Sequence, residues 1–203
     1  MLLSKLDQVV IRDLGITKYQ DTFSAMKDFV AKGNEEAIWL VEHEPVFTLG
    51  TAADQKHILK KTNIEIVQAD RGGEVTYHGP GQIVIYFLLD VKRLNCGPNK
   101  LVSTIQDFVK ELLSKLSIEC NFKEGAPGVY VDKKKIASIG LRISKGKSYH
   151  GISINFDMDL SPFKQINPCG YEGLEVTQIK DLNKDISKLQ LHGIIIDLLR
   201  KIF

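Results

Sequence analysis

The stretch Asp70-Arg71-Gly-Gly-Glu-Val-Thr-Tyr-His78-Gly-Pro-Gly-Gln82 leads directly into an apolar run at residues 83–89. Because glycine has no Cβ, a loop this rich in glycine can turn tightly and bring bare backbone amides close to a ligand. The run that follows, Ile-Val-Ile-Tyr-Phe-Leu-Leu, is short, β-branched and aromatic, which predicts a buried strand. A loop anchored to such a strand is well placed to carry a site.

The same glycines would also be typical of a simple hairpin. Polar side chains in this loop favour a binding site over a plain turn, since Arg71, Thr76, Tyr77 and His78 all fall within it. The sequence therefore predicts that this loop contacts a ligand.

Composition excludes several classes of protein. The chain has 203 residues, of which 43% are hydrophobic and 26% are charged, as in an ordinary globular domain that needs no metal or disulfide for stability. A formal net charge of +2 gives no case for binding nucleic acid or a membrane surface. The first residues become charged too soon for a signal peptide, and no apolar run has the length of a membrane span. We expect a cytoplasmic protein.

Three segments show apolar residues at helical spacing. The first pattern stops at Gly33 and the second is preceded by Pro98, which are typical end and start signals. The apolar positions are Tyr19, Phe23, Met26 and Val30 in the first segment, Leu101, Ile105, Phe108, Leu112 and Leu116 in the second, and Ile186, Leu189, Ile195 or Ile196, and Leu199 in the last.

Strand patterns lie between these helices. The expected strands cover residues 8–14, with Val9, Val10 and Ile11 as apolar core, then 37–41, 46–49, 64–67 and 83–89, with several short runs between 120 and 155. Turns at 125–128, 132–135 and 144–148 separate the short runs, which predicts antiparallel hairpins. We therefore predict one α+β domain over residues 1–203, with a mixed, largely antiparallel sheet flanked by helices.

Cysteine chemistry is the strongest catalytic signal. Cys96, Cys120 and Cys169 are odd in number and form no Cys-x-x-Cys pair, which argues against a disulfide framework or a structural zinc site. Cys169 lies in the turn Asn-Pro-Cys-Gly, and a free thiol, with a pKa of about 8.5, needs a neighbour to become a thiolate. Candidate neighbours are His78, His150 and Lys135.

Lys135 can be interpreted in two ways. It precedes the apolar segment Ile136-Ala-Ser-Ile-Gly140, which would carry its amine into a dry cleft where it becomes a competent base. Taken alone, however, three consecutive lysines at 133–135 favour a solvated turn.

Several separated motifs together resemble one family, the lipoyl (octanoyl) transferases of lipoate biosynthesis. The motifs are the loop Arg71–Gln82, Lys135-Ile-Ala-Ser-Ile-Gly140, His150-Gly-Ile-Ser153, and Leu160-Ser-Pro-Phe163 through Asn167-Pro-Cys-Gly170 to Thr177-Gln178. They span most of the chain, whereas the N-terminal part and the last helix match less distinctively. The resemblance implies the fold of the biotin and lipoate protein ligases, in agreement with the α+β prediction.

The resemblance also implies residue roles. Cys169 would be the nucleophile that forms an acyl thioester, and Lys135 would be the residue that lowers the pKa of its thiol. No metal or cofactor is implied, and the protein is expected to be a monomer. The implied substrate-binding residues are Arg71, Gly72, Gly73, Glu74, Val75, Thr76, Tyr77, His78, Ser138, Ile139, Gly140, Gly151, Ile152 and Ser153.

The implied reaction has two partners. Octanoyl-acyl carrier protein would donate the acyl group to Cys169, and a lysine of a lipoyl domain, in a 2-oxoacid dehydrogenase complex or the glycine cleavage H protein, would accept it. Lys135 would act first as acid and then as base, with backbone amides of the loop as oxyanion donors. Ile83, Ile85 and Phe87, or the alternate face of their strand, could line an apolar acyl tunnel.

Other interpretations stay open from the sequence. The same fold serves ATP-dependent lipoate or biotin protein ligases, which need no nucleophilic cysteine. The chain could also be a non-catalytic module that binds acyl groups or carrier proteins, or a papain-like hydrolase using His78. The basic residues Lys133, Lys134, Arg142, Lys145 and Lys147 could dock an acidic carrier protein or form an ordinary solvated face.

Overall fold

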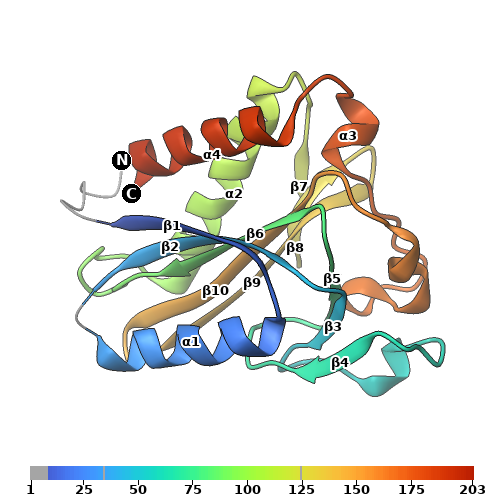
Figure 1. The fold of residues 1–203 in the computed structure, drawn as a ribbon, viewed down its shortest axis with the longest axis horizontal. Coiled ribbons are helices and arrows are strands. Elements are labelled where there is room, and N and C mark those ends of the chain that lie inside the picture. The colour runs from blue at the N-terminus through green and yellow to red at the C-terminus, as the bar shows by residue number, and fades with distance from the viewer. Residues whose placement is uncertain (1–8, 34, 124) are drawn as a thin grey trace.

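Two sheets form the core of the protein (Figure 1). The computed structural model describes residues 9–33, 35–123 and 125–203, with Cys169 described by its backbone alone. The main sheet has seven strands in the order β1 (Val10–Thr17), β2 (Ala37–His43), β6 (Gln82–Leu88), β10 (Lys147–Asn155), β9 (Lys134–Ser144), β8 (Ala126–Val131) and β7 (Asn121–Lys123). The small sheet has the order β4 (Glu65–Gln68), β3 (Val46–Leu49) and β5 (Val75–His78).

Strand direction confirms the predicted mixed sheet. In the main sheet β1 and β2 run parallel, whereas every other neighbouring pair is antiparallel. The hairpins turn at Asp132-Lys133 and at Lys145-Gly146, where all four residues have positive φ. The expected antiparallel hairpins between residues 120 and 155 are therefore confirmed.

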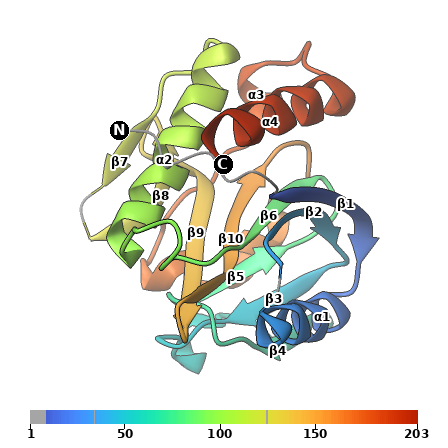
Figure 2. The same cartoon turned by 90° about the vertical axis from the view of Figure 1, so that its left-hand side faces the viewer.

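Helices cover both faces of the main sheet (Figures 1 and 2). One face packs against α1 (Tyr19–Lys32), and the other packs against α2 (Pro98–Lys115) and α4 (Lys188–Ile202). Strand alternation in β2 divides its side chains accordingly: Trp39 faces α1, whereas Ile38 and Leu40 join the core under α2 and α4. The shorter helical segments are η1 (Gln55–His57), η2 (Ser161–Gln165), η3 (Pro168–Gly170) and α3 (Ile179–Leu182).

The expected helix boundaries of α1 and α2 are confirmed. Gly33 adopts a left-handed φ of 69° and donates its N–H to the Phe29 carbonyl, which ends α1. Pro98 lies in the first turn of α2, where its missing N–H costs no hydrogen bond. Within the described residues, no helix has the length and apolarity to cross a membrane.

Three local predictions were wrong. The first strand begins at Val10 and lies at the edge of the sheet, so Val10 is 47% exposed rather than core; residue 8 lies outside the described residues. Residues 126–128 belong to β8 rather than to a turn. In the last segment Ile186 precedes the helix, whose cap is Ser187, and Leu189 is 84% exposed while Leu191 is buried.

Candidate active site

Small residues form a trough across the main sheet. Gly140 on β9 pairs with Gly151 on β10, which pairs in turn with Tyr86 on β6. In a neighbouring row, Val84 on β6 pairs with Ser153 on β10, Ser153 pairs with Ser138 on β9, and Ser138 pairs with Gly128 on β8. Because the glycine and serine side chains in these rows are absent or small, they leave space above the sheet, and a cavity of about 580 Å³ opens there. The sequence places this small-residue surface beside the glycine-rich loop.

The glycine-rich loop lies along β9, beyond the part of that strand that pairs with β8. Gly72 donates its N–H to the Leu141 carbonyl at 3.1 Å. A Cβ on Gly140 would stand only 3.0 Å from the Gly72 carbonyl oxygen, so glycine at 140 is what allows the loop to lie this close. The loop thereby forms one wall of the cavity.

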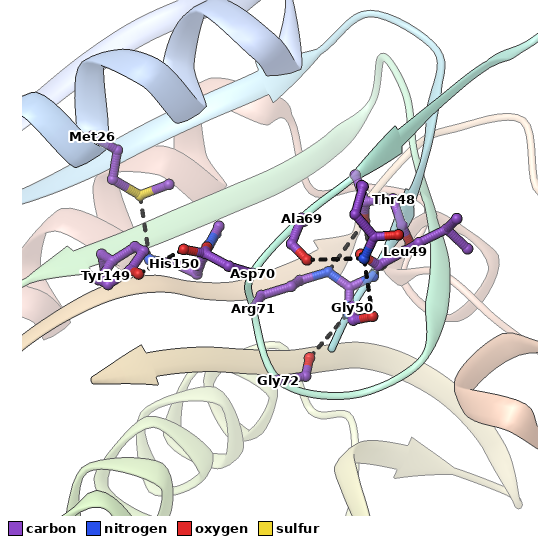
Figure 3. Close-up of polar contacts among 11 residues, drawn as sticks. Met26, Thr48, Leu49, Gly50, Ala69, Asp70, Arg71, Gly72, Tyr149 and His150 are labelled. Atoms are coloured by element: carbon purple, nitrogen blue, oxygen red, sulfur yellow. Dashed lines mark hydrogen bonds and ion pairs between the residues drawn. The ribbon is translucent and has the colours of Figure 1, made fainter. Parts of the chain in front are cut away.

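Arg71 fastens the loop to the small sheet (Figure 3). Its guanidinium donates to the Thr48 carbonyl at 2.7 Å, to the Thr48 hydroxyl at 2.8 Å and to the Gly72 carbonyl at 3.0 Å. Arg71 is buried and lines the cavity, so it brings a positive charge to the site.

A buried chain of polar contacts continues from Thr48. Its hydroxyl accepts from Arg71 and can donate to His78 Nε2 at 3.4 Å, while His78 Nδ1 donates to Gln82 Oε1 at 2.7 Å. Gln82 donates to Asn155 Oδ1 at 2.9 Å, and Asn155 Nδ2 donates to the Thr177 carbonyl at 2.9 Å. Each member is satisfied by the next, so the chain holds one geometry.

Residues 175–177 hold Lys135. The Lys135 N–H donates to the Glu175 carbonyl at 2.9 Å, and the Thr177 N–H donates back to the Lys135 carbonyl at 3.0 Å. The side chain is only 1% exposed: its Nζ donates to the Pro127 carbonyl at 3.3 Å and lies 5.2 Å from the centre of the Tyr130 ring. A buried lysine is rare, and the solvated-turn interpretation of Lys135 is therefore wrong.

The turn that carries Cys169 lies beside the cavity wall. η3 packs against β5, and a Cβ on Gly170 would be 3.3 Å from the Glu74 side chain, which lines the cavity. The Asn167 N–H donates to the His57 carbonyl at 2.8 Å, which fixes the start of the turn. The Cys169 side chain lies outside what the structure describes.

Three buried histidines lie at or near the cavity as neutral rings; His78 and His150 line it, and His43 packs against His78. Burial lowers the pKa of His43 to about 4 and that of His150 to about 4, and burial also lowers the pKa of His78 well below its ordinary value. His43 Nε2 accepts from the Tyr86 hydroxyl at 2.6 Å. Because these imidazoles are neutral, Arg71 and Arg142 are the cationic side chains in the described cavity wall.

His150 and Tyr149 together bind Asp70 (Figure 3). His150 Nε2 lies 2.7 Å from one carboxylate oxygen, and the Tyr149 hydroxyl donates to the other at 2.7 Å. Burial acts to raise the pKa of Asp70, but these two hydrogen bonds outweigh it and the pKa is lowered. Because an anionic Asp70 only accepts, the neutral His150 carries its proton on Nε2 and presents a bare Nδ1.

These histidines predict acid sensitivity. Unfolded histidines, with a pKa of 6.5, take up protons on acidification while His43 and His150 stay neutral down to about pH 4. The unfolded state then binds more protons, so the free energy of unfolding falls between pH 6.5 and pH 4. From pH 7 to pH 5 we expect a loss of about 2 kcal/mol per histidine. Urea denaturation at both pH values measures this loss in the free energy of unfolding.

A His43→Gln variant is the control for this prediction. It removes one of the titrating rings, so its free energy of unfolding should depend less steeply on pH than that of the unmodified protein. A free energy of unfolding that stays constant from pH 7 to pH 5 in the unmodified protein would contradict the prediction.

Most residues singled out from the sequence meet at this cavity. Those in its wall are Arg71, Gly72, Gly73, Glu74, Val75, Thr76, His78, Ser138, Ile139, Gly140, Gly151, Ile152 and Ser153. Tyr77 does not line it and instead packs in a separate cluster with Phe47 and Phe163. Lys135 lies behind Pro127, which lines the wall. On β6 the alternate face, Val84 and Tyr86, lines the cavity, whereas Ile83, Ile85 and Phe87 are core.

Sequence reasoning missed several cavity residues. Tyr19 carries the signal of an apolar helix position, and nothing in its local pattern separates it from the core residue Phe23. Pro127 contacts the Lys135 amine across the β8–β9 hairpin, and Tyr171 lies two residues after Cys169, but neither carries a signal of its own in the sequence. The wall residues that were not singled out as site residues include Tyr19, Pro127, Leu141 and Tyr171.

Comparison with known proteins identifies close sequence relatives. The model of the lipoyl protein ligase A/B catalytic domain matches residues 19–199. An octanoyltransferase of Dechloromonas aromatica (strain RCB) is 55% identical over 177 residues, which cover 86% of this chain and 86% of that protein. An octanoyltransferase of Hahella chejuensis (strain KCTC 2396) is 47% identical over 187 residues, covering 91% and 84% of the two chains.

Solved structures show the same fold at low sequence identity. Lipoate-protein ligase A bound with ATP has a TM-score of 0.73 at 15% identity, over 96% of this chain and 85% of that one. A bi-partite lipoate protein ligase from Thermoplasma acidophilum has a TM-score of 0.73 at 15% identity, over 96% and 83%. Biotin protein ligase from Aquifex aeolicus has a TM-score of 0.53 at 15% identity, over 97% and 71%. The expected ligase-like fold is confirmed.

Proposed function

The chain belongs to the lipoyl protein ligase A/B catalytic domain family, and from this premise we propose that it transfers octanoyl groups through a thioester on Cys169, assisted by Lys135. Its octanoyltransferase relatives, at 47% and 55% identity, make it an acyltransferase of protein lipoylation, with an acyl donor and a lipoyl-domain acceptor. The ATP-dependent ligases share only the fold, at 15% identity.

The burial of Lys135 carries the proposal. Its Nζ contacts the Pro127 carbonyl and the Tyr130 ring, and its backbone is paired with residues 175–177. Residues 175–177 follow the Cys169 turn in the sequence, so one short segment connects Cys169 to the backbone that holds Lys135. A lysine that the fold buries beside a cavity is a strong candidate for chemistry, because burial of an amine for stability alone is unfavourable.

A glycine at position 128 leaves room for the Lys135 side chain. Gly128 has a φ of 149°, and a Cβ there would lie 3.0 Å from Lys135 Cε and 2.7 Å from the Ala137 carbonyl oxygen. Any side chain at 128 would displace the lysine. This requirement supports a fixed position for the amine, as proton transfer needs.

The proposed reaction has two half-reactions. The Cys169 thiolate attacks the carbonyl carbon of the donor thioester, the new C–S bond forms, and the donor thiolate leaves with a proton from Lys135. The acceptor amine then attacks the enzyme thioester, gives a proton to Lys135 and forms the amide while the Cys169 thiolate is released. Thioester for thioester exchange needs no ATP, and amide formation drives the second half.

Backbone amides of the loop that contains Gly72 and Gly73 are candidate oxyanion donors in both halves, since they stand at the cavity wall without needing to reorganise. Val84 and the glycines of the trough leave room for the alkyl chain. Burying about six methylenes there would contribute roughly 5 kcal/mol to binding.

The proposed donor is octanoyl-acyl carrier protein, and the proposed acceptors are lipoyl domains of 2-oxoacid dehydrogenase complexes and the glycine cleavage H protein. Residues 1–203 act as one catalytic domain, monomeric and cytoplasmic. Of the basic residues considered for carrier docking, Lys134 pairs with Glu175 at 3.2 Å and Lys147 pairs with Asp90 at 2.9 Å.

Intact-mass spectrometry tests the function. After incubation with octanoyl-acyl carrier protein and no ATP, we expect the protein to gain one octanoyl group that hydroxylamine removes. Free octanoate with ATP should give no adduct and no transfer to a lipoyl domain. The reverse pattern, with ATP-dependent use of free octanoate and no adduct from the carrier, would indicate a ligase instead.

A further inference from the structure

A β-bulge lies at the start of β9, next to Lys135. Val129 on β8 pairs with Ala137 on β9. The next residue on β8, Tyr130, pairs with Lys135 instead of Ile136, which is left as an extra residue of β9 in this ladder. Bulges of this kind re-aim a side chain and are frequent next to active sites. The bulge therefore decides where the Lys135 amine points.

The bulge turns the Lys135 side chain out of the apolar core. Ile136 and Ala137 are successive residues, yet both belong to the core under α2 and α4. Strict alternation would put Lys135 on the same side as Ala137, where its ammonium would be buried among apolar groups. Instead, a Cβ on Gly128 would stand 3.0 Å from Lys135 Cε, and Gly128 pairs with the cavity residue Ser138. The lysine thus lies on the cavity side of the sheet.

The Tyr130 ring contacts the amine on this side. Lys135 Nζ lies 5.2 Å from the centre of the ring, within the range of a cation–π interaction. The Tyr130 hydroxyl donates to the Ala126 carbonyl at 3.2 Å, which holds the ring in one orientation. Tyr130 is only 1% exposed, and a desolvated ring attracts a cation more strongly than a ring in water does.

Tyr130 also stands between Lys135 and the surface. Tyr130 lines a surface pocket of about 330 Å³ together with Lys123 and Lys133, and the described lining of that pocket does not include Lys135. The ammonium of the exposed Lys123 lies 4.3 Å from the centre of the same ring. A smaller side chain at position 130 would therefore open a route for water from this pocket to the Lys135 amine.

We propose that Tyr130 is a positioning residue for octanoyl transfer. Together with the bulge, its ring holds the Lys135 amine on the cavity side of the sheet and keeps water from it. Proton transfer needs a fixed geometry, so loss of the ring should slow the chemical steps without changing how the donor binds. The inference rests on the proposed function, because Tyr130 acts through Lys135 and itself transfers no proton.

Replacing the ring tests this role. Tyr130→Leu keeps an apolar side chain but removes the ring, and we expect kcat for octanoyl transfer to fall about ten-fold while KM for octanoyl-acyl carrier protein stays within about two-fold. Tyr130→Phe keeps the ring and loses only the hydrogen bond to Ala126, so its kcat should stay within about three-fold of that of the unmodified protein. Initial rates at varied donor concentration measure both constants. A fall in Tyr130→Phe as large as that in Tyr130→Leu would overturn the role of the ring.

A double-mutant cycle shows whether Tyr130 acts through Lys135. In the Lys135→Met background, Tyr130→Leu should change kcat by less than about two-fold, because the group that the ring positions is gone. A further ten-fold fall in that background would mean that the ring supports the fold as a whole, and would overturn the inference.

Phe156→Leu is the matched control. Phe156 is 3% exposed and has Lys180 Nζ 6.0 Å from the centre of its ring, but it does not belong to the described cavity wall. Loss of this ring should leave kcat within about two-fold of that of the unmodified protein.

The same variants separate this inference from the proposed function. If Lys135→Met transfers octanoyl groups at the unmodified rate, the proposed role of Lys135 fails, and the role of Tyr130 fails with it. If Lys135→Met is slow but Tyr130→Leu is as fast as the unmodified protein, the proposed function stands and the role of Tyr130 alone is refuted.

Discussion

Replacing Cys169 with alanine will abolish covalent loading and lower octanoyl transfer by about 10⁴-fold or more, as loss of a nucleophile does in other covalent enzymes. Without the thiol no enzyme thioester can form, and the acceptor amine would have to attack the carrier thioester directly. Intact mass after incubation with octanoyl-acyl carrier protein measures loading, and transfer of octanoate to a lipoyl domain measures turnover.

The other cysteines provide matched controls. Burial raises the pKa of the Cys96 thiol and that of the Cys120 thiol, so both are poorly ionised at neutral pH, and neither lines the cavity. Cys96→Ala and Cys120→Ala should load one octanoyl group as the unmodified protein does. An adduct that persists on Cys169→Ala, or that is lost from one of the controls, would refute the assignment of the nucleophile.

Replacing Lys135 with methionine should lower octanoyl transfer by about 10²- to 10⁴-fold, the range typical of a lost general acid and base. Methionine is unbranched and apolar, so it suits a side chain that is only 1% exposed. A purely structural role would change stability and leave the chemistry intact. Alkylation of Cys169 by iodoacetamide across a pH series distinguishes the two, since loss of the ammonium should move the reaction to higher pH.

Lys134→Met is the control for Lys135. Lys134 is the preceding residue in the same strand, but its side chain is 48% exposed and pairs with Glu175 at the surface. Such an exposed ion pair contributes little to stability, and octanoyl transfer by Lys134→Met should stay within about two-fold of that by the unmodified protein. Circular dichroism of both variants checks the fold. Transfer by a folded Lys135→Met at the unmodified rate would exclude the proposed acid and base.

Features with local causes could be predicted from the sequence. The spacing of Tyr19, Phe23 and Met26 predicted α1, and Gly33 fixed its end because the left-handed conformation is easiest for glycine. The strand of residues 83–89 was predicted because its β-branched and aromatic residues suit a sheet buried on both faces. The α+β class and the mixed sheet followed from the same patterns.

Features decided by distant contacts could not be predicted in the same way. Lys135 follows two other lysines, and only its pairing with residues 175–177 and its contact with Pro127 carry it into the interior. The sequence also could not predict which face of β6 lines the cavity, because both faces are apolar. The structure shows that space remains on the face beside the glycines of the trough. Leu189 satisfied the helical period but sits beyond the reach of the sheet, so it is exposed.

The bridge between Lys135 and Val176 has a consequence for how the protein is made. It joins the start of β9 to a segment that leaves the ribosome long afterwards, and pairings so remote in sequence close late in folding. Until residues 175–177 emerge, the lysine lacks the backbone partners that hold it inside. A nascent chain therefore acquires its reactive centre only near the end of synthesis, after the sheet and α2 can already have formed.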